Sequence, residues 1–201
     1  MKKGCKTVID SKARKYVQPV IGWTGRKLLF VGLTANQITW LAFLIGATSG
    51  IFVYLENFWL AGTVLWFSGF LDAVDGSMAR EVQNTTSWGT LLDITFDRIV
   101  EISFIIGLSL SFPEVRLFFL LMTCSIILSM TIFLTVGSLS KKEGIKSFYY
   151  QAGFAERTEG FLLFTLMLIF PYLIIEIAIF YTIAVLFTAL QRLFEARKLL
   201  Q

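Results

Sequence analysis

The sequence predicts an all-α integral membrane protein, in which six transmembrane helices follow an N-terminal interfacial amphipathic helix. The 201-residue chain is 56% hydrophobic and only 16% charged, against about 45–50% and about 25% in soluble domains. Its mean hydropathy is +0.71. Apolar stretches recur along it, each close to the roughly 20 residues that a helix needs to cross a hydrocarbon core about 30 Å thick.

Residues 1–33 form a basic segment ahead of the first predicted span. Within 10–33, apolar residues recur at helical spacing opposite basic ones, and Trp23 adds a ring that favours the membrane interface. We therefore expect an amphipathic helix lying on the inner leaflet, interrupted by Pro19 and Gly22. The alternative is an irregular basic tail. The first 27 residues lack a continuous apolar stretch, so no cleaved signal peptide is expected.

The rest of the chain, 34–201, is predicted to be one membrane domain. Its six expected spans are 34–55, 58–80, 88–112, 114–137, 156–171 and 172–194. Pro113 and Pro171 mark the turns between the third and fourth spans and between the fifth and sixth, because proline does not continue a helix.

Lysine and arginine fall almost entirely on one side of these spans. The loops on the other side carry only Arg116. The positive-inside rule therefore places both termini, and the ends of the second and fourth spans, on the cytoplasmic side of the cell membrane. The formal net charge of +4 then suits anionic lipid headgroups, and no nucleic-acid partner is expected.

Four aspartates lie inside apolar segments, where carboxylates are costly: Asp72, Asp75, Asp93 and Asp97. Four isolated charges in hydrocarbon would cost on the order of 10 kcal/mol on the insertion scale. Spacings of three and four residues put each pair on one face of its helix, and antiparallel neighbours would bring both pairs to one depth. The chain has no histidine, and clustered oxygen ligands suit Mg²⁺ or Mn²⁺; we expect two ions.

Small and polar residues surround this acidic cluster. Gly76, Ala79 and Gly89 would permit close approach of a ligand or a helix. Arg80 has a planar fork that suits phosphate oxygens, although an arginine at this depth can also simply extend to the interface. Asn36 and Thr39 begin the first span at the same depth, where either could also satisfy free backbone N–H groups of a helix start.

Residues 72–97 read D-x2-D-G-x2-A-R-x8-G-x3-D-x3-D without a gap. This pattern resembles the signature of the CDP-alcohol phosphotransferases, integral membrane enzymes of phospholipid head-group synthesis. Eight fixed positions, each filled about one time in fifteen, would coincide by chance on the order of once in a billion start positions. The stretch Thr34 to Thr39 is similar to the family's Pro-Asn-x-x-Thr, with Ala35 in place of the proline.

The resemblance implies a role for each matched residue. Asp72, Asp75 and Asp93 would be the main metal ligands, while Asp97 would touch a metal and act as general base. The cytidine diphosphate group would contact residues with small or polar side chains: Asn36, Thr39, Gly76, Ala79, Arg80 and Thr86. The implied reaction moves a lipid-bearing phosphoryl group from a CDP-linked lipid to the hydroxyl of a small polar alcohol and releases CMP. A homodimer is also expected, from the resemblance and from small residues on the spans.

The expected acceptor is a phosphorylated polyol, either inositol phosphate or glycerol phosphate. Lys141, Lys142, Lys146 and Arg157 form a cationic cluster that could bind its phosphate. Gly153 to Arg157 resembles the Gly-x-Ala-Glu-Arg stretch of family members that use inositol phosphate, but Gly160 stands where those carry a second arginine. The lysines could instead only set topology, serine remains an alternative acceptor, and the donor could be a diacyl lipid or an archaeal ether lipid.

Two functions from other classes are weighed against this one. A cation transporter would need acidic residues continuing across the bilayer, whereas the four aspartates share one depth. An inactive lipid-binding homologue would have lost a residue of the motif, and none is lost. Glu101, one turn beyond Asp97, would either repel it or pair with Arg98.

Overall fold

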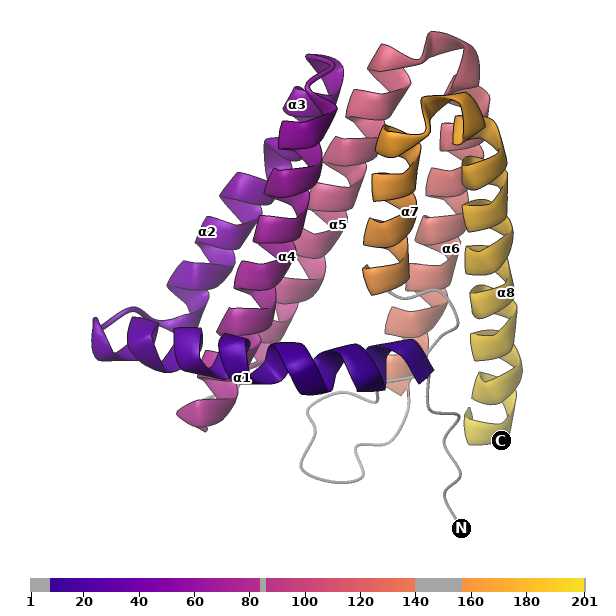
Figure 1. Cartoon of the computed structure of the whole chain (residues 1–201). Helices are drawn as coiled ribbons and strands as arrows, with labels where there is room; N and C mark the ends of the chain where they lie inside the picture. The colour runs from indigo at the N-terminus through magenta and orange to yellow at the C-terminus, as the bar shows by residue number, and fades with distance from the viewer. Residues whose placement is uncertain (1–7, 84–85, 140–156, 201) are drawn as a thin grey trace. The chain divides into compact units, whose positions relative to one another are not determined.

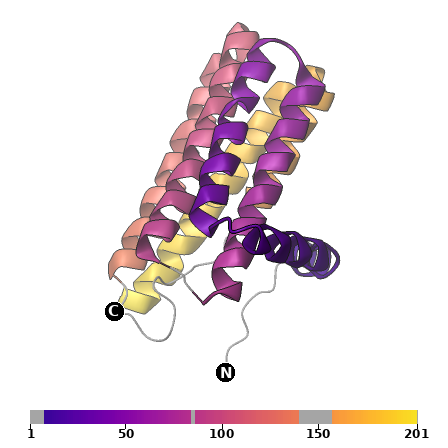
Figure 2. The ribbon, with the colours of Figure 1, turned by 90° about the vertical axis from the view of Figure 1, so that its left-hand side faces the viewer.

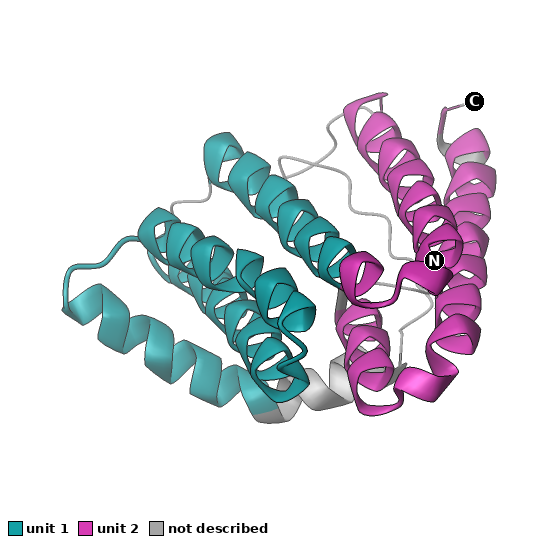
Figure 3. Ribbon diagram, turned by 90° about the horizontal axis from the view of Figure 1, so that it is seen from above, with its two compact units in different colours: residues 1–107 teal, residues 108–201 magenta. Residues whose placement is uncertain are grey.

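The computed structural model describes residues 8–83, 86–139 and 157–200, which are helical apart from short turns. The elements in chain order are α1 (Val8–Phe30), α2 (Ala35–Ala47), α3 (Ser49–Tyr54), α4 (Phe58–Glu81), α5 (Ser87–Ser111), η1 (Pro113–Val115), α6 (Arg116–Leu139), α7 (Arg157–Ile169), η2 (Pro171–Leu173) and α8 (Ile174–Leu200) (Figure 1). They form two compact units, residues 1–107 and 108–201, called unit 1 and unit 2 below (Figure 3).

In unit 1, α2, α3, α4 and α5 run alongside one another, and α1 runs crosswise to them (Figures 1 and 2). A capping box begins α2: the Thr34 Oγ1 accepts from the Gln37 N–H at 3.4 Å, and the Thr34 N–H donates to the Gln37 Oε1 at 2.8 Å. This reciprocal cap satisfies backbone donors that a helix start otherwise leaves free. It also fixes the start of α2, where Asn36 lies.

The prediction that Pro19 and Gly22 interrupt the first helix is wrong, because α1 is continuous through both. An interior proline removes one backbone hydrogen bond and destabilises the helix. Packing of α1 against α4 compensates for this loss. Ile21 lies in a buried cluster with Val74 and Met78 of α4. A Cβ added to Gly25 would lie 3.2 Å from the Met78 Cγ, so α1 rests closely on α4. The irregular tail is thereby excluded for residues 8–30.

The first predicted span, 34–55, is two helices that break at Thr48. The Ser103 Oγ of α5 donates to the Ala47 carbonyl oxygen at 2.7 Å, and the Thr48 Oγ1 donates to the Ile45 carbonyl oxygen at 2.7 Å. Side chains inserted into the carbonyl ladder bend a helix at that point. The break therefore comes from a hydrogen bond with a neighbouring helix.

The helices of unit 1 approach each other at backbone distance. A Cβ added to Gly50 would collide with the Ser103 carbonyl group, and one added to Gly107 would collide with the Gly50 carbonyl group. The Ser68 Oγ of α4 donates to the Ala42 carbonyl oxygen of α2 at 2.8 Å. Small residues and serine hydroxyls that bridge helices are typical of packing inside membranes.

In unit 2, α6 and α8 pack along each other, and α7 packs on α8. Large buried side chains fill the unit, among them Phe119, Met122, Phe164 and Met167. Pro113 and Pro171 each begin a short 3₁₀ turn that leads into the next long helix, as predicted. The missing N–H of proline costs nothing at a first helical position.

Three helical segments of the described chain are long and apolar enough to cross a bilayer: Ala35–Tyr54, Pro113–Leu139 and Pro171–Arg197. The apolar part of α7, Thr158–Ile169, is shorter. The helices α4 and α5, which carry the aspartates, lie within two residues of the predicted bounds 58–80 and 88–112. The all-helical fold is confirmed for the described residues, and the six membrane spans stay a prediction.

Candidate metal and active site

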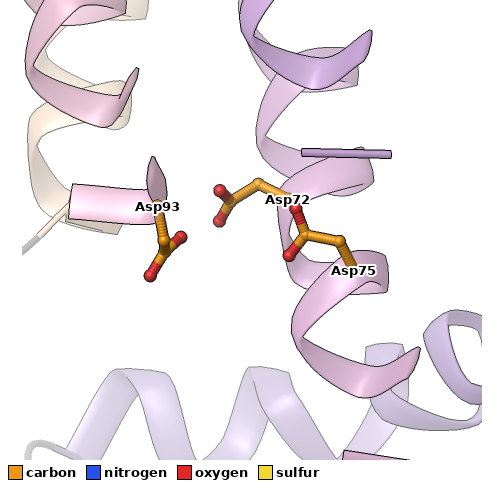
Figure 4. Close-up of side chains that lie close together, drawn as sticks. All are labelled: Asp72, Asp75 and Asp93. Atoms are coloured by element: carbon orange, nitrogen blue, oxygen red, sulfur yellow. The ribbon is translucent and has the colours of Figure 1, made fainter. Parts of the chain in front are cut away.

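The carboxylates that the sequence singles out lie on α4 and α5. One carboxylate oxygen from each of Asp72, Asp75 and Asp93 lies within 4.8 Å of the other two. Asp93 points from α5 toward Asp72 and Asp75 on α4 (Figure 4). Three of the four predicted carboxylates therefore converge from two helices, as the antiparallel arrangement predicted.

Three carboxylates at this separation repel each other when ionised. At about 5 Å and an effective dielectric constant near 20, each pair of charges repels by about 3 kcal/mol. Asp75 is buried and Asp72 is half-buried, so solvent screens the group only in part. Convergent carboxylate oxygens without nitrogen or sulfur donors fit a hard divalent cation such as Mg²⁺ or Mn²⁺. These three carboxylates are therefore chemically suited to bind the expected Mg²⁺ or Mn²⁺.

Asp97 follows Asp93 by one turn of α5 and is half-buried. It is not a member of the three-carboxylate group. Both its predicted contact with a metal and its predicted role as general base stay predictions.

Arg80 folds back over Gly76, one turn earlier on α4. A Cβ placed on Gly76 would lie 3.4 Å from the Arg80 Nη1. Ala79 precedes Arg80 and is half-buried, whereas Arg80 itself is exposed. The glycine therefore leaves room for the guanidinium one turn beyond Asp75, where it could meet a phosphate oxygen.

The starts of α2 and α5 come together around Gly89. The Thr86 Oγ1 accepts from the Gly89 N–H at 3.0 Å, as an N-cap of α5. A Cβ placed on Gly89 would lie 3.3 Å from the Thr86 Oγ1 and 3.4 Å from the Asn36 Oδ1. The structure thus brings Asn36 close to Thr86 and Gly89, which follow it by about 50 residues in the sequence.

Thr39 is buried, and its Oγ1 donates to the Ala35 carbonyl oxygen of its own helix at 3.1 Å. The Thr39 hydroxyl thus already has a hydrogen-bond acceptor within its own helix. Its predicted contact with the cytidine diphosphate group stays a prediction. Lys142, with Lys141 and Lys146, lies outside the described residues. Arg157 is the first residue of α7, and its side chain also lies outside the described part.

Comparison with known proteins identifies the fold and the family. Residues 32–191 match the family described as CDP-alcohol phosphatidyltransferase. The chain belongs to this family. It is 32% identical over 194 residues to the archaetidylinositol phosphate synthase of Pyrococcus horikoshii, which covers 95% of this chain and 98% of that protein. The inner membrane protein YnjF of Escherichia coli is 31% identical over 82% of this chain and 83% of its own length.

Solved structures agree on the fold of this CDP-alcohol phosphatidyltransferase. The phosphatidylinositol phosphate synthase of Mycobacterium tuberculosis with CDP-DAG bound is 23% identical, with a TM-score of 0.75 over 89% of this chain and 94% of that one. The same enzyme in complex with manganese and citrate also has a TM-score of 0.75, over 88% of each chain. The resemblance found in the motif is confirmed, and the chain is a transferase of phospholipid biosynthesis.

Gly160 of this family member lies against a tyrosine. A Cβ on Gly160 would lie 2.5 Å from the Tyr181 Oη, and Tyr181 is buried edge-on against Phe164. A side chain at position 160 would therefore need Tyr181 to move. The sequence lacks a second arginine at position 160, and Tyr181 of α8 occupies the space that a side chain there would need.

Sequence reasoning missed one buried cation in unit 2. Arg192 of α8 is 7% exposed. Its Nη1 donates to the Ser129 Oγ of α6 at 3.2 Å, and its guanidinium carbon lies 4.8 Å from the centre of the Phe133 ring. The sequence could have indicated it, because Arg192 lies inside the predicted span 172–194. A charged side chain is costly there and is usually paired with a specific partner.

Proposed function

We propose that this enzyme transfers a lipid-bearing phosphoryl group from a CDP-linked lipid to inositol phosphate and releases CMP. The observation that carries the proposal is the convergence of Asp72, Asp75 and Asp93 from two helices in a chain of this family. The same three residues, together with Asp97, are proposed to hold two divalent cations, Mg²⁺ or Mn²⁺.

The cations would neutralise the charge on the pyrophosphate of the donor lipid. The chain's own residues orient that donor. Arg80 can swing from Gly76 to form charge-assisted hydrogen bonds with a phosphate oxygen. Ala79 and Gly76 leave space along α4, while Asn36 and Thr86 offer polar groups beside Gly89. The cytidine diphosphate group is proposed to lie between the starts of α2 and α5 and the end of α4, with Thr39 on the same helix as Asn36.

Asp97 is the proposed general base. It takes the proton of the acceptor hydroxyl as that oxygen bonds to the lipid-bearing phosphorus. The phosphorus–oxygen bond to CMP breaks in the same transfer, and CMP leaves with the electron pair. The position of Asp97, one turn from Asp93 and outside the group of three, supports giving it the proton-transfer role.

The choice of inositol phosphate rests on relatives and on sequence. The relative from Pyrococcus horikoshii that aligns with 95% of this chain is an archaetidylinositol phosphate synthase. The phosphatidylinositol phosphate synthase of Streptomyces avermitilis is 33% identical over 100 residues. Lys142 and Arg157 are proposed to bind the acceptor's phosphate, with Lys141 and Lys146 beside Lys142.

The proposed membrane arrangement keeps the active site and both termini on the cytoplasmic side. The N-terminal segment 1–33 would precede a membrane domain of six spans, 34–201, and two copies would form a homodimer. On α1, Val20, Trp23 and Phe30 are exposed, and the Lys27 Nζ lies 3.9 Å from the centre of the Trp23 ring. Exposed apolar and basic side chains on one helix suit the inner leaflet. A reporter fused to either terminus and active only outside the cytoplasm would contradict this topology.

A CMP-release assay tests the proposed reaction. The purified enzyme is supplied with Mg²⁺ and either CDP-diacylglycerol or a CDP-linked archaeal ether lipid, which decides the donor. Each donor is tested with inositol phosphate, glycerol phosphate, serine, inositol and choline. We expect release with inositol phosphate. Release with serine and with neither phosphate would overturn the acceptor assignment while leaving the family reaction in place.

A further inference from the structure

One stripe of α1 is buried against α4. Ile21 is buried in the cluster that holds Val74 and Met78 of α4. A Cβ on Gly25 would lie 3.2 Å from the Met78 Cγ and 3.7 Å from the Val74 carbonyl oxygen. Because Ile21 and Gly25 are four residues apart, they share one face of the helix. This face of α1 is therefore occupied by α4, at the turn that carries Asp75.

A second stripe of α1 is exposed. Trp23, Arg26, Lys27 and Phe30 occupy positions i, i+3, i+4 and i+7 of the helix, so they share one face, and we call them the outer stripe. Residues two apart lie on nearly opposite sides of a helix, so Trp23 lies opposite Ile21. Trp23 is 55% exposed and Phe30 is 94% exposed, and both cations are exposed as well. The outer stripe thus has an aromatic ring at each end and two positive charges between them.

The two cations extend back toward the turn that carries Trp23. The Lys27 Nζ lies 3.9 Å from the centre of the Trp23 ring. The Arg26 Nη1 would lie 3.6 Å from a Cβ on Gly22, so the glycine leaves room for the guanidinium. Indole rings prefer the headgroup level of a bilayer, and an ammonium group is attracted to the face of an indole. One turn of α1 thus presents an aromatic ring and two positive charges together.

The charge of the outer stripe discriminates between possible occupants. Residues 17–33 contain two basic residues, Arg26 and Lys27, and no aspartate or glutamate. A second copy of the chain, docked through the same face, would bring like charges together across a twofold axis. Water would leave both aromatic rings exposed to solvent. A phospholipid surface suits both kinds of side chain, and each nearby lysine or arginine favours negatively charged headgroups over zwitterionic ones.

We propose that the outer stripe of α1 is a binding surface for anionic phospholipids of the bilayer. Trp23 and Phe30 enter the headgroup region, and Arg26 and Lys27 form charge-assisted hydrogen bonds with the negatively charged headgroups. The inference rests on the proposed membrane arrangement and adds to it a class of lipid and the residues that recognise it. Since the opposite face of α1 packs beside Asp75, bound lipid also joins that end of α4 to the membrane surface.

Fluorescence quenching in nanodiscs tests this without any substrate. The full-length protein is placed in bilayers of phosphatidylglycerol and phosphatidylcholine in equal amounts, with bromine on the chains of one lipid or of the other. The difference between wild type and Trp23→Phe gives the quenching of Trp23 alone. Each cation near the surface should enrich the anionic lipid about fivefold, so brominated phosphatidylglycerol should quench Trp23 at least about twofold more than brominated phosphatidylcholine.

Replacing the two cations separates charge from mere contact with the membrane. Arg26→Gln combined with Lys27→Gln, measured with and without Trp23→Phe, should bring the ratio of the two quenching values to about 1. Arg26→Lys combined with Lys27→Arg keeps both charges and should keep the preference for the anionic lipid. Loss of the preference in this second pair would contradict recognition by charge.

Trp59 provides the matched control, because it is 85% exposed at the start of α4 and residues 51–70 contain no lysine or arginine. The corresponding difference for Trp59→Phe should show no preference for the anionic lipid. Equal quenching of Trp23 by both lipids, or a preference that survives removal of both charges, would overturn the inference and leave the membrane arrangement in place. Quenching of Trp23 by neither lipid would refute the inference together with the placement of α1 on the membrane.

Discussion

Helices in unit 1 meet at backbone distance through glycine and serine, whereas helices in unit 2 meet through their side chains. In unit 1, Gly50 and Gly107 abut backbone carbonyl groups of a neighbouring helix. Ser68 donates to a carbonyl oxygen of another helix. In the described part of unit 2, threonine hydroxyls such as that of Thr182 donate to their own helix, and the close neighbour of Gly160 is a side chain.

The difference follows the position of the carboxylates. Metal–ligand distances in well-formed sites lie within about 0.2 Å of their usual values. Backbone contacts fix the spacing of two helices more firmly than side chains do, because side chains can change rotamer. Unit 1 carries Asp72, Asp75 and Asp93 on α4 and α5. The close contacts hold α4 to α2 through Ser68 and α5 to α3 through Gly50 and Gly107.

The largest expected effect compares carboxylates of the two units. Asp93→Asn should lose Mn²⁺ binding together with at least about 1,000-fold of kcat/KM, because a bound metal supplies several kcal/mol of charge stabilisation. Glu176→Gln is the control in unit 2, where Glu176 is exposed in the first turn of α8 and suits the helix dipole. Titration of Mn²⁺ and CMP release measure both. Equal loss in the two variants would remove the functional contrast between the units.

The next effect separates two tasks within unit 1. Asp97→Asn should lower kcat by about 100- to 1,000-fold, the usual contribution of a general base, while the CDP-lipid still binds. Single-turnover CMP release and direct binding of the donor lipid distinguish these quantities. Turnover near the wild-type rate would show that Asp97 is not the base.

A smaller effect tests the two kinds of helix contact. Gly50→Ala places a methyl group on the backbone of α5 and should cost about 2–3 kcal/mol of stability, toward the upper end for an overpacked core. Gly160→Ala meets the Tyr181 hydroxyl, so adding Tyr181→Phe should recover part of its loss. Thermal unfolding midpoints in one detergent give the comparison. A Gly160→Ala protein less stable than Gly50→Ala would reverse the ranking of the units.

The smallest effect concerns single hydroxyl groups. Ser68→Ala removes a hydrogen bond between α4 and α2 and should cost about 0.6 kcal/mol, the average for such bonds in membranes. Thr182→Val removes a bond within α8 and should change stability by less than about 0.5 kcal/mol. Replicate equilibrium unfolding measurements in mixed micelles compare the free energies of unfolding of the two variants. A larger loss in Thr182→Val would mean that unit 2 also depends on hydroxyl contacts.

Composition and spacing predicted the helices well. The ends of α4 and α5 lie within two residues of the bounds read from hydrophobicity, and the spacing of Asp72, Asp75 and Asp93 correctly predicted their convergence. These features are local, because the period of a helix fixes which side chains share a face. Pro113 and Pro171 likewise marked the turns, since their effect on the backbone does not depend on neighbours.

Contacts between helices decided the rest. Pro19 and Gly22 predicted an interruption that the packing of Ile21 and Gly25 on α4 overrides. The break at Thr48 coincides with a hydrogen bond from the Ser103 hydroxyl to the Ala47 carbonyl oxygen, 56 residues away in sequence.

For Glu101, the sequence left two possibilities open, repulsion of Asp97 or pairing with Arg98. The structure shows the pairing. The sequence by itself therefore determined the family, through its motif, and which of the motif's side chains share a helical face. Tertiary structure decided the contacts between helices, such as those of Ser68 and Ser103 with carbonyl oxygens of neighbouring helices, because they join positions that no helical period relates.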